Sequence, residues 1–335
     1  MKFDKIDHIV LLGGARLMAE FAPHVKKNYK VTAVLSPRHA VEKVDSAENL
    51  EQSLKKNGVT VLIVEDINRA PELEKIITPA TLGIGLGPAW SFEKKIIDKF
   101  GGRLLNFMGI RLPRYRGGAH YTWQILNRSK IGACNLQVIA EDIDHGAVVK
   151  SKEYLLSASA RIPKDYFDAA MKEEISFLDE FLAEAKSGKE FAPIKLDESI
   201  AEYYPFLSTA KQGFINWNWL PEDVEAFICA FDEPYAGAST FLDGKLVRLK
   251  NCELDKKVKP FHPFNTGVVF RVWKNEIYIA TTQGALIVKD LRDENGKDIM
   301  KEVHVDQRFY TPSKYIDEAM GFHAEYSAKG LKKQK

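Results

Sequence analysis

Four side chains in the first half of the chain have types that suit proton transfer or the stabilisation of charge: Asn106, His120, Asp144 and His145. A carboxamide NH2 can donate to a developing negative charge, and a carboxylate or a neutral imidazole can accept a proton. Asn106 follows a strand predicted at Arg103–Leu105, at the carboxyl end where open α/β sheets place their ligands. An aspartate in a turn before a glycine is commonly a turn former, so Asp144 taken alone leaves both roles open.

The loop between Asn106 and the helix predicted from His120 is rich in proline, glycine and arginine. Long loops often carry glycine and proline for conformational reasons only. Composition alone therefore favours a plain crossover loop, and the order of the residues has to decide. The arginine, proline and glycine residues of this loop are Arg111, Pro113, Arg114, Arg116, Gly117 and Gly118.

Two segments together resemble a known family. Leu104 to Ala119 reads LLNFMGIRLPRYRGGA, and Glu141 to Val149 reads EDIDHGAVV. They resemble the active-site loop of the formyltransferases that use 10-formyltetrahydrofolate, the family of methionyl-tRNA formyltransferase and the sugar-nucleotide N-formyltransferases. The family pattern is Asn-x-His, then Leu-Pro-x-x-x-Gly, then Asp-x-Gly. The matching residues here are Asn106, Leu112, Pro113, Gly117, Asp144 and Gly146, with Met108 at the histidine position.

The resemblance extends along most of the chain. Trp123, Ile125 and Leu126 follow the loop at the family's spacing, and two further segments, Gly213–Trp217 and Ala230–Ala238, resemble its Gly-x-Ile-x-Trp and Ala-x-x-x-Pro-x-x-Gly-Ala patterns. The family often has arginine before that alanine, whereas this chain has Cys229. A substrate contact made by such an arginine would be absent.

The resemblance implies transfer of a formyl group from the folate N10 to an amine, through a tetrahedral oxyanion. It implies that Asn106 donates to the oxyanion and that Asp144 accepts the amine proton or orients a water or a base. Met108 can do neither, because its thioether is apolar. The residues expected to contact the folate are Leu86, Gly87, Arg111, Leu112, Pro113 and Gly117.

Three explanations for Met108 stay open. Another histidine can take the missing role. One candidate is His120, where the dipole of the helix would favour the neutral ring. The other is His145, although adjacent side chains in an extended segment point in opposite directions, so it would point away from Asp144. Alternatively, Asn106 and Asp144 suffice for an amine that arrives unprotonated, or the protein binds without catalysing. We take His120 as the third catalytic candidate.

Charge and cysteine content bear on partners and compartment. The 48 basic and 46 acidic residues leave a net charge of +2, without the field that nucleic acid or a membrane would require. A small nucleotide-linked amino sugar is therefore the expected acceptor. Methionyl-tRNA formylation and a non-catalytic folate- or nucleotide-binding relative are the alternatives, and a homodimer is left open. The three cysteines are far apart and lack metal-ligand spacing, so we expect no metal. We find no signal peptide and no apolar span in this sequence, so we expect a cytoplasmic protein.

Short apolar runs alternate with helical stretches through the first half, which predicts an α/β fold with a mostly parallel, doubly wound, Rossmann-like sheet. The turn at Gly13-Gly14 does not continue as a dinucleotide G-x-G-x-x-G, because Ala15 and Met18 occupy the later glycine positions. Short strands separated by turn residues after residue 237 predict a smaller β-rich, barrel-like domain. We expect domains at 1–190 and 200–306, followed by a helix and tail at 307–335.

Overall fold

The computed structural model describes residues 1–3, 5–44, 48–141, 145–327 and 330–332. Its larger sheet has the order β3-β2-β1-β4-β5-β7-β8. The first five strands in that order are parallel, and β7 and β8 are antiparallel. The strands are β1 His8–Gly13, β2 Lys30–Leu35, β3 Thr60–Ile63, β4 Thr81–Leu86, β5 Leu104–Met108, β7 Ile131–Val138 and β8 Val148–Leu155.

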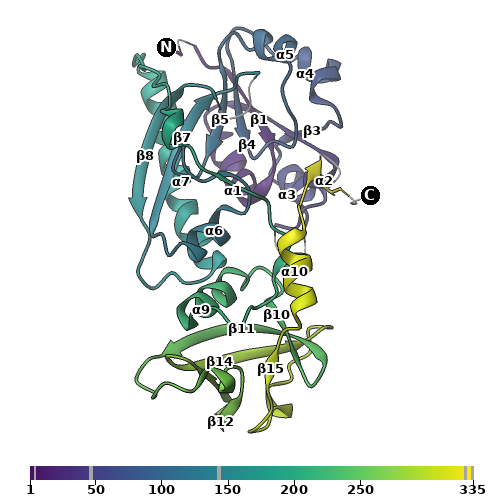
Figure 1. Ribbon diagram of the computed structural model, residues 1–335. Coiled ribbons are helices and arrows are strands. Elements are labelled where there is room, and N and C mark those ends of the chain that lie inside the picture. Colours follow the sequence, from purple (N-terminus) through teal and green to yellow (C-terminus); the bar gives the residue numbers. More distant parts are fainter. Residues whose placement is uncertain (4, 45–47, 142–144, 328–329, 333–335) are drawn as a thin grey trace.

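Helices cover both faces of this sheet, as Figure 1 shows. On one face, Phe21 and Phe177 belong to the core between the sheet, α1 and α7. On the other, Ile96 of α5 and Phe100 at its end belong to a core with Leu12 and Leu104 of the sheet. The mostly parallel, doubly wound prediction is confirmed. The helices are α1 Ala15–Val25, α2 Pro37–Ala40, α3 Leu50–Lys56, α4 Pro71–Glu74, α5 Lys94–Lys99, α6 His120–Leu126 and α7 Pro163–Lys186.

The second sheet is antiparallel, with the order β12-β13-β14-β11-β10-β15. A bridge between Val268 and Arg308 joins its two ends, so the strands curl into a barrel-like shape, as predicted. Helix α9, Pro221–Ala230, contributes Ile228 to the core of this part. The strands are β10 Ala238–Leu242, β11 Lys245–Asp255, β12 Val269–Trp273, β13 Glu276–Thr281, β14 Gly284–Asp293 and β15 Phe309–Tyr310.

The two parts stack end to end, and α10, Ser313–Gly321, runs beside their junction (Figure 1). The linker between them contains β9, Tyr203–Tyr204, and ends at α8, Thr209–Gln212. A last hairpin pairs β16, Tyr326–Ser327, with β17, Gly330–Leu331.

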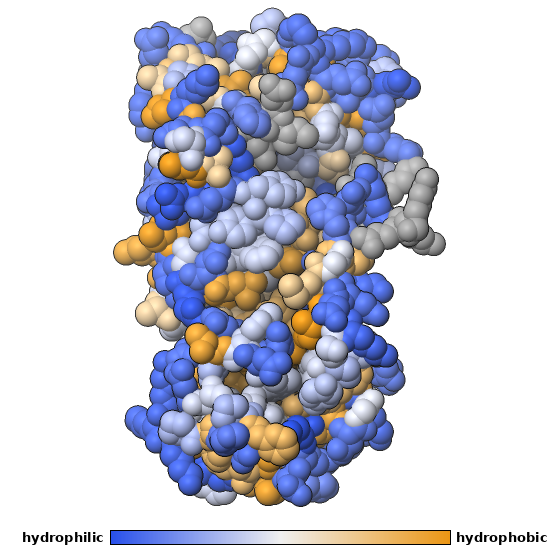
Figure 2. Space-filling model, in the orientation of Figure 1, coloured by the Kyte–Doolittle hydropathy of each residue, from blue (hydrophilic) through white to orange (hydrophobic). Residues whose placement is uncertain are grey.

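The face in Figure 2 is mostly hydrophilic, and apolar side chains gather where the two parts meet. Among the residues that the structure describes, none of the helices combines the length and the apolar composition that a bilayer span requires.

Candidate active site

Asn106 lies within β5, where it pairs with Gly85 of β4 and Gln137 of β7. The predicted strand ended at Leu105, so this boundary was wrong. The strand continues because Gly85 leaves room for the carboxamide: a Cβ there would lie 2.8 Å from Asn106 Oδ1. That buried oxygen accepts no hydrogen bond from the described residues. The carboxamide thus turns its oxygen toward β4 and its NH2 group away from it.

Met108 is the last residue of β5 and is half-buried. Asn135 of β7 fixes the chain just beyond it, because its Nδ2 donates to the carbonyls of Met108 at 3.4 Å and Ile110 at 2.5 Å. Asn135 is held in turn by Ser151, whose Oγ donates to Asn135 Oδ1 at 2.7 Å. The backbone at position 108 is therefore held in place, although the methionine side chain has no proton to transfer.

The segment Leu104–Ala119, called the signature loop below, is clamped by the linker. Within it, β6, Arg116–Gly117, pairs in parallel with β9. Arg116 is buried and donates from Nη1 and Nη2 to the two carboxylate oxygens of Glu198, at 2.6 and 2.9 Å. The bidentate geometry fixes both position and orientation of the guanidinium. Composition alone had favoured a plain crossover with solvated arginines, and the structure shows a built contact instead.

Aromatic packing completes the clamp. The rings of Tyr115 and Tyr204 stack at 5.0 Å with an interplanar angle of 14°. Trp123 of α6 donates from Nε1 to the carbonyl of Pro205 at 2.8 Å. At Gly117, φ is +105° and a Cβ would lie 1.9 Å from the carbonyl oxygen of Tyr204. Only glycine fits there.

His120 begins α6. Its Nε2 lies 3.1 Å from the carbonyl oxygen of Gly117, so the neutral ring donates through Nε2 and keeps Nδ1 as an acceptor. Burial lowers the pKa of His120 to about 4. The ring is therefore neutral near pH 7, as a base must be, and burial is the main cause where the sequence had suggested the helix dipole.

His145 points to the linker. Its Nε2 lies 3.7 Å from Glu198 Oε2, in the carboxylate that also binds Arg116, and its side chain is 54% exposed. Asp144, the predicted proton acceptor, lies outside the described residues, as do residues 142 and 143. The sequence hypothesis depends on the distance between His120 and Asp144, which is therefore not described either.

The residues expected to contact the folate fall on two neighbouring segments. Leu86 ends β4 beside β5, with its side chain in the core and its carbonyl accepting from Gly14 N at 3.0 Å. Gly87 follows with φ +63° and open space where a Cβ would point. In the signature loop, Arg111 donates from Nε to Glu153 at 2.8 Å, and the Pro113 carbonyl accepts from Glu202 N at 3.3 Å. Leu112 lies between them, and Gly117 pairs with the linker.

Sequence reasoning missed Glu174 of α7. Its buried carboxylate accepts a hydrogen bond from the Tyr121 hydroxyl at 3.2 Å, and a Cβ at Gly109 would lie 2.7 Å from its Oε1. Burial raises the pKa of Glu174 to about 7. A signal was present, because a glutamate three residues after Met171 interrupts the apolar stripe of α7.

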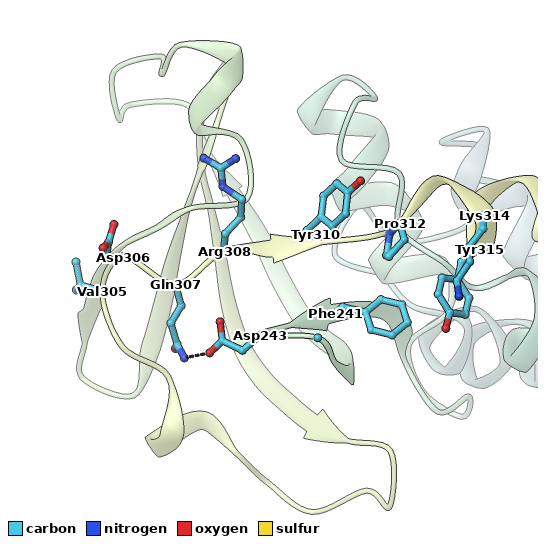
Figure 3. A pocket seen from close by; sticks show the side chains of 11 residues that line it. Phe241, Asp243, Val305, Asp306, Gln307, Arg308, Tyr310, Pro312, Lys314 and Tyr315 are labelled. Atoms are coloured by element: carbon cyan, nitrogen blue, oxygen red, sulfur yellow. Dashed lines mark hydrogen bonds between the residues drawn. The ribbon is translucent and has the colours of Figure 1, made fainter.

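A large hollow of about 660 Å³ lies elsewhere, in the C-terminal part (Figure 3). Phe241, Tyr310 and Tyr315 line it, and Gln307 Nε2 donates to Asp243 at 2.6 Å. None of its lining residues belongs to the signature loop, so the hollow adds nothing to this site. No group of three or more metal-ligating side chains occurs within the described ranges.

Comparisons with known proteins fit this geometry. The family model described as "Formyl transferase, C-terminal domain" matches residues 208–304. Methionyl-tRNA formyltransferase of Desulfotalea psychrophila is 28% identical over 210 residues, which are 62% of this chain and 62% of that protein. The same enzyme of Clostridium tetani is 23% identical over 311 residues, 89% of this chain and 95% of its own length.

Among solved structures, the N-formyltransferase of Helicobacter canadensis, in complex with folinic acid and dTDP-3-aminofucose, has a TM-score of 0.65 at 14% identity. The match covers 88% of this chain and 100% of that one, and it confirms the two-part fold. The family model, the sequence relatives and the structural match together support the formyltransferase family, a family of formyl transfer enzymes. The sequence relatives carry the name of a tRNA-modifying enzyme, while the structural relative was solved with a nucleotide-linked amino sugar.

Proposed function

We propose that this chain transfers a formyl group from 10-formyltetrahydrofolate to an amine. The observation that carries the proposal is Asn106: a strand-borne carboxamide whose buried oxygen faces Gly85 of β4, which leaves its NH2 group as the donor. Just after β4, no atom lies within 4 Å of the place that a Cβ of Gly87 would take. We infer that the folate co-substrate lies next to Asn106, within reach of the signature loop.

The reaction needs three things from these residues. The amine nitrogen attacks the formyl carbon, and its electron pair forms the new C–N bond while the carbonyl oxygen becomes an oxyanion. Asn106 Nδ2 donates to that oxyanion. Asp144 takes the amine proton or orients the group that does. Collapse of the intermediate expels the folate N10, which gains the proton that was taken from the amine.

His120 is the base that replaces the histidine missing at position 108. Its support is its Nδ1, which the hydrogen bond at Nε2 leaves as an acceptor, on a ring that is neutral near pH 7. The pKa of about 4 makes this ring a weaker base than a free imidazole. His145 is the weaker candidate, because its ring lies against Glu198. Catalysis by Asn106 and Asp144 without a third group is the alternative.

A nucleotide-linked amino sugar is the proposed acceptor. A protein that holds tRNA neutralises several phosphates at once, whereas this chain has a net charge of only +2. The co-crystallised dTDP-3-aminofucose of the Helicobacter canadensis relative supports the same class. Methionyl-tRNA stays the second candidate, because the curated sequence relatives are methionyl-tRNA formyltransferases.

The test supplies purified protein with 10-formyltetrahydrofolate and either a panel of nucleotide-linked amino sugars or methionyl-tRNA, and measures release of tetrahydrofolate. Asn106→Ala should lower kcat by about 10²–10³-fold, as loss of one oxyanion donor does in other enzymes. The matched control is the exposed Asn57→Ala, which should leave kcat unchanged. Tight folate binding without turnover on any amine would favour the non-catalytic reading.

We also propose the domain division 1–190, 200–306 and 307–335, the last containing α10. A cytoplasmic location is proposed because Cys134, Cys229 and Cys252 are free and buried. Thiols of this kind persist in a reducing compartment.

A further inference from the structure

Two exposed aromatic rings of the linker lie against the glycine pair of the signature loop. Tyr203 is 66% exposed and Phe206 is 41% exposed. A Cβ at Gly117 would lie 3.1 Å from Tyr203 Cε2, and one at Gly118 would lie 2.2 Å from Phe206 Cδ1. Both rings come this close because the loop carries no side chain at either position.

The support beneath these rings is rigid. Tyr203 lies in β9, and its neighbour Tyr204 packs inward on Tyr115 and on Trp123, with ring centroids 5.0 and 5.3 Å apart. Side chains alternate along a strand, so Tyr203 points outward. Its ring is therefore held in place without being covered.

A rigid, uncovered ring favours a planar partner. Tyrosine gives a large contact area at a small entropy cost, and stacking on it accepts any base, because every base has a π-face. A cation contacts the linker here: Arg114 Nη1 is 3.9 Å from the carboxylate of Glu202, the residue before Tyr203. An exposed ring and a cation on adjoining segments suit the base and the phosphates of a nucleotide.

We propose that Tyr203 is the stacking platform for the nucleobase of a nucleotide-linked acceptor. The inference rests on the proposed function and names the residue that selects the nucleotide. Tyr203 determines specificity by binding the base, at a distance from the reacting atoms. Its removal should weaken acceptor binding and leave the chemical step and the folate site intact.

The experiment compares wild type with Tyr203→Ala and Tyr203→Phe, using Tyr310→Ala as the matched control because Tyr310 is an equally exposed tyrosine, at 58%, in the other part. Calorimetry with UDP, dTDP, CDP, GDP and ADP gives Kd without any need for turnover. Kinetics on a nucleotide-linked amino sugar then give KM for the acceptor and for 10-formyltetrahydrofolate.

Tyr203→Ala should raise both the nucleoside diphosphate Kd and the acceptor KM about 5- to 150-fold, the range of base stacking on an aromatic ring. Tyr203→Phe should stay near wild type, and Tyr310→Ala should have no effect. An unchanged Kd, an equal rise in the folate KM, or binding of methionyl-tRNA but of no nucleoside diphosphate would overturn the proposal. Nucleotide binding that depends on Tyr203 without formyl transfer would support the platform and refute only the proposed activity.

Discussion

Replacing Glu174 with glutamine should make the protein more stable above neutral pH. Glu174 is buried beneath the signature loop and receives one hydrogen bond, from the Tyr121 hydroxyl. Two more titratable groups interact electrostatically with it, Tyr154 of β8 and Cys134 of β7, and the Glu174 charge raises the pKa of both. Burial disfavours the charged carboxylate and raises the pKa of Glu174 from 4.5 to about 7.

The sign and size follow from that shift. The folded state holds the proton more tightly than the unfolded state, so the contribution to stability is complete below pH 4.5 and is lost as the pH rises through about 7. The difference between 4.5 and about 7, at ~1.4 kcal/mol per pKa unit, amounts to about 3 kcal/mol. Glutamine has nearly the same shape and stays neutral, so it avoids this loss.

Urea unfolding at pH 5, 6, 7 and 8 measures the effect. The free energy of unfolding of Glu174→Gln, relative to that of wild type, should increase as the pH rises, by up to about 3 kcal/mol. Glu173→Gln is the control on the same helix: its carboxylate pairs with Lys152 at 3.2 Å near the surface, where ion pairs contribute little. Parallel stability curves for wild type and Glu174→Gln would refute the reasoning.

Three further changes test the site. Met108→His should raise kcat at least about tenfold if the pocket still accepts an imidazole, and an unchanged rate, like that of Met108→Leu, would show a pocket rebuilt around the thioether. His120→Gln should lower kcat/KM about a hundredfold. Because the pKa of His120 is about 4, the kcat/KM of wild type should not change with the protonation of this group between about pH 5 and 8. A fall in kcat/KM below about pH 6.5 would exclude His120 as the base. Gly117→Ala should lower Tm more than Gly244→Ala, because both have positive φ but only Gly117 meets a backbone oxygen, and equal losses in a thermal melt would contradict this.

The sheet strands could be predicted well where burial is continuous. Lys30–Leu35 and Ala238–Leu242 can be read from the sequence, because each is a mainly β-branched and apolar run bounded by turn-forming or polar residues. Helix α7 can be read from the apolar spacing along its length. These elements carry their own signal.

The site depends on partners that lie far away in the sequence. Asn106 looked like a strand end because it is polar, yet β5 continues to Met108, because Gly85 of β4 leaves room for the carboxamide and Gln137 of β7 pairs with Asn106. The pairing of β6 with β9 joins two-residue strands without local pattern. Helix α9 is different, since Pro221 at its first turn and the acids after it were a readable start signal.

The shape of the signature loop bears on whether it still works. Tyr115 and Ala119 adopt φ values of 58° and 54°, in the left-handed region that non-glycine residues avoid at a cost of about 1–3 kcal/mol each. Such backbone persists only where its surroundings fix it, and here the Arg116–Glu198 pair, the β6–β9 pairing and the tyrosine stack do so. A loop that only connects two elements does not require such backbone strain. The strain therefore favours a loop shaped to hold a ligand, and this shape is present with Met108 at the end of β5.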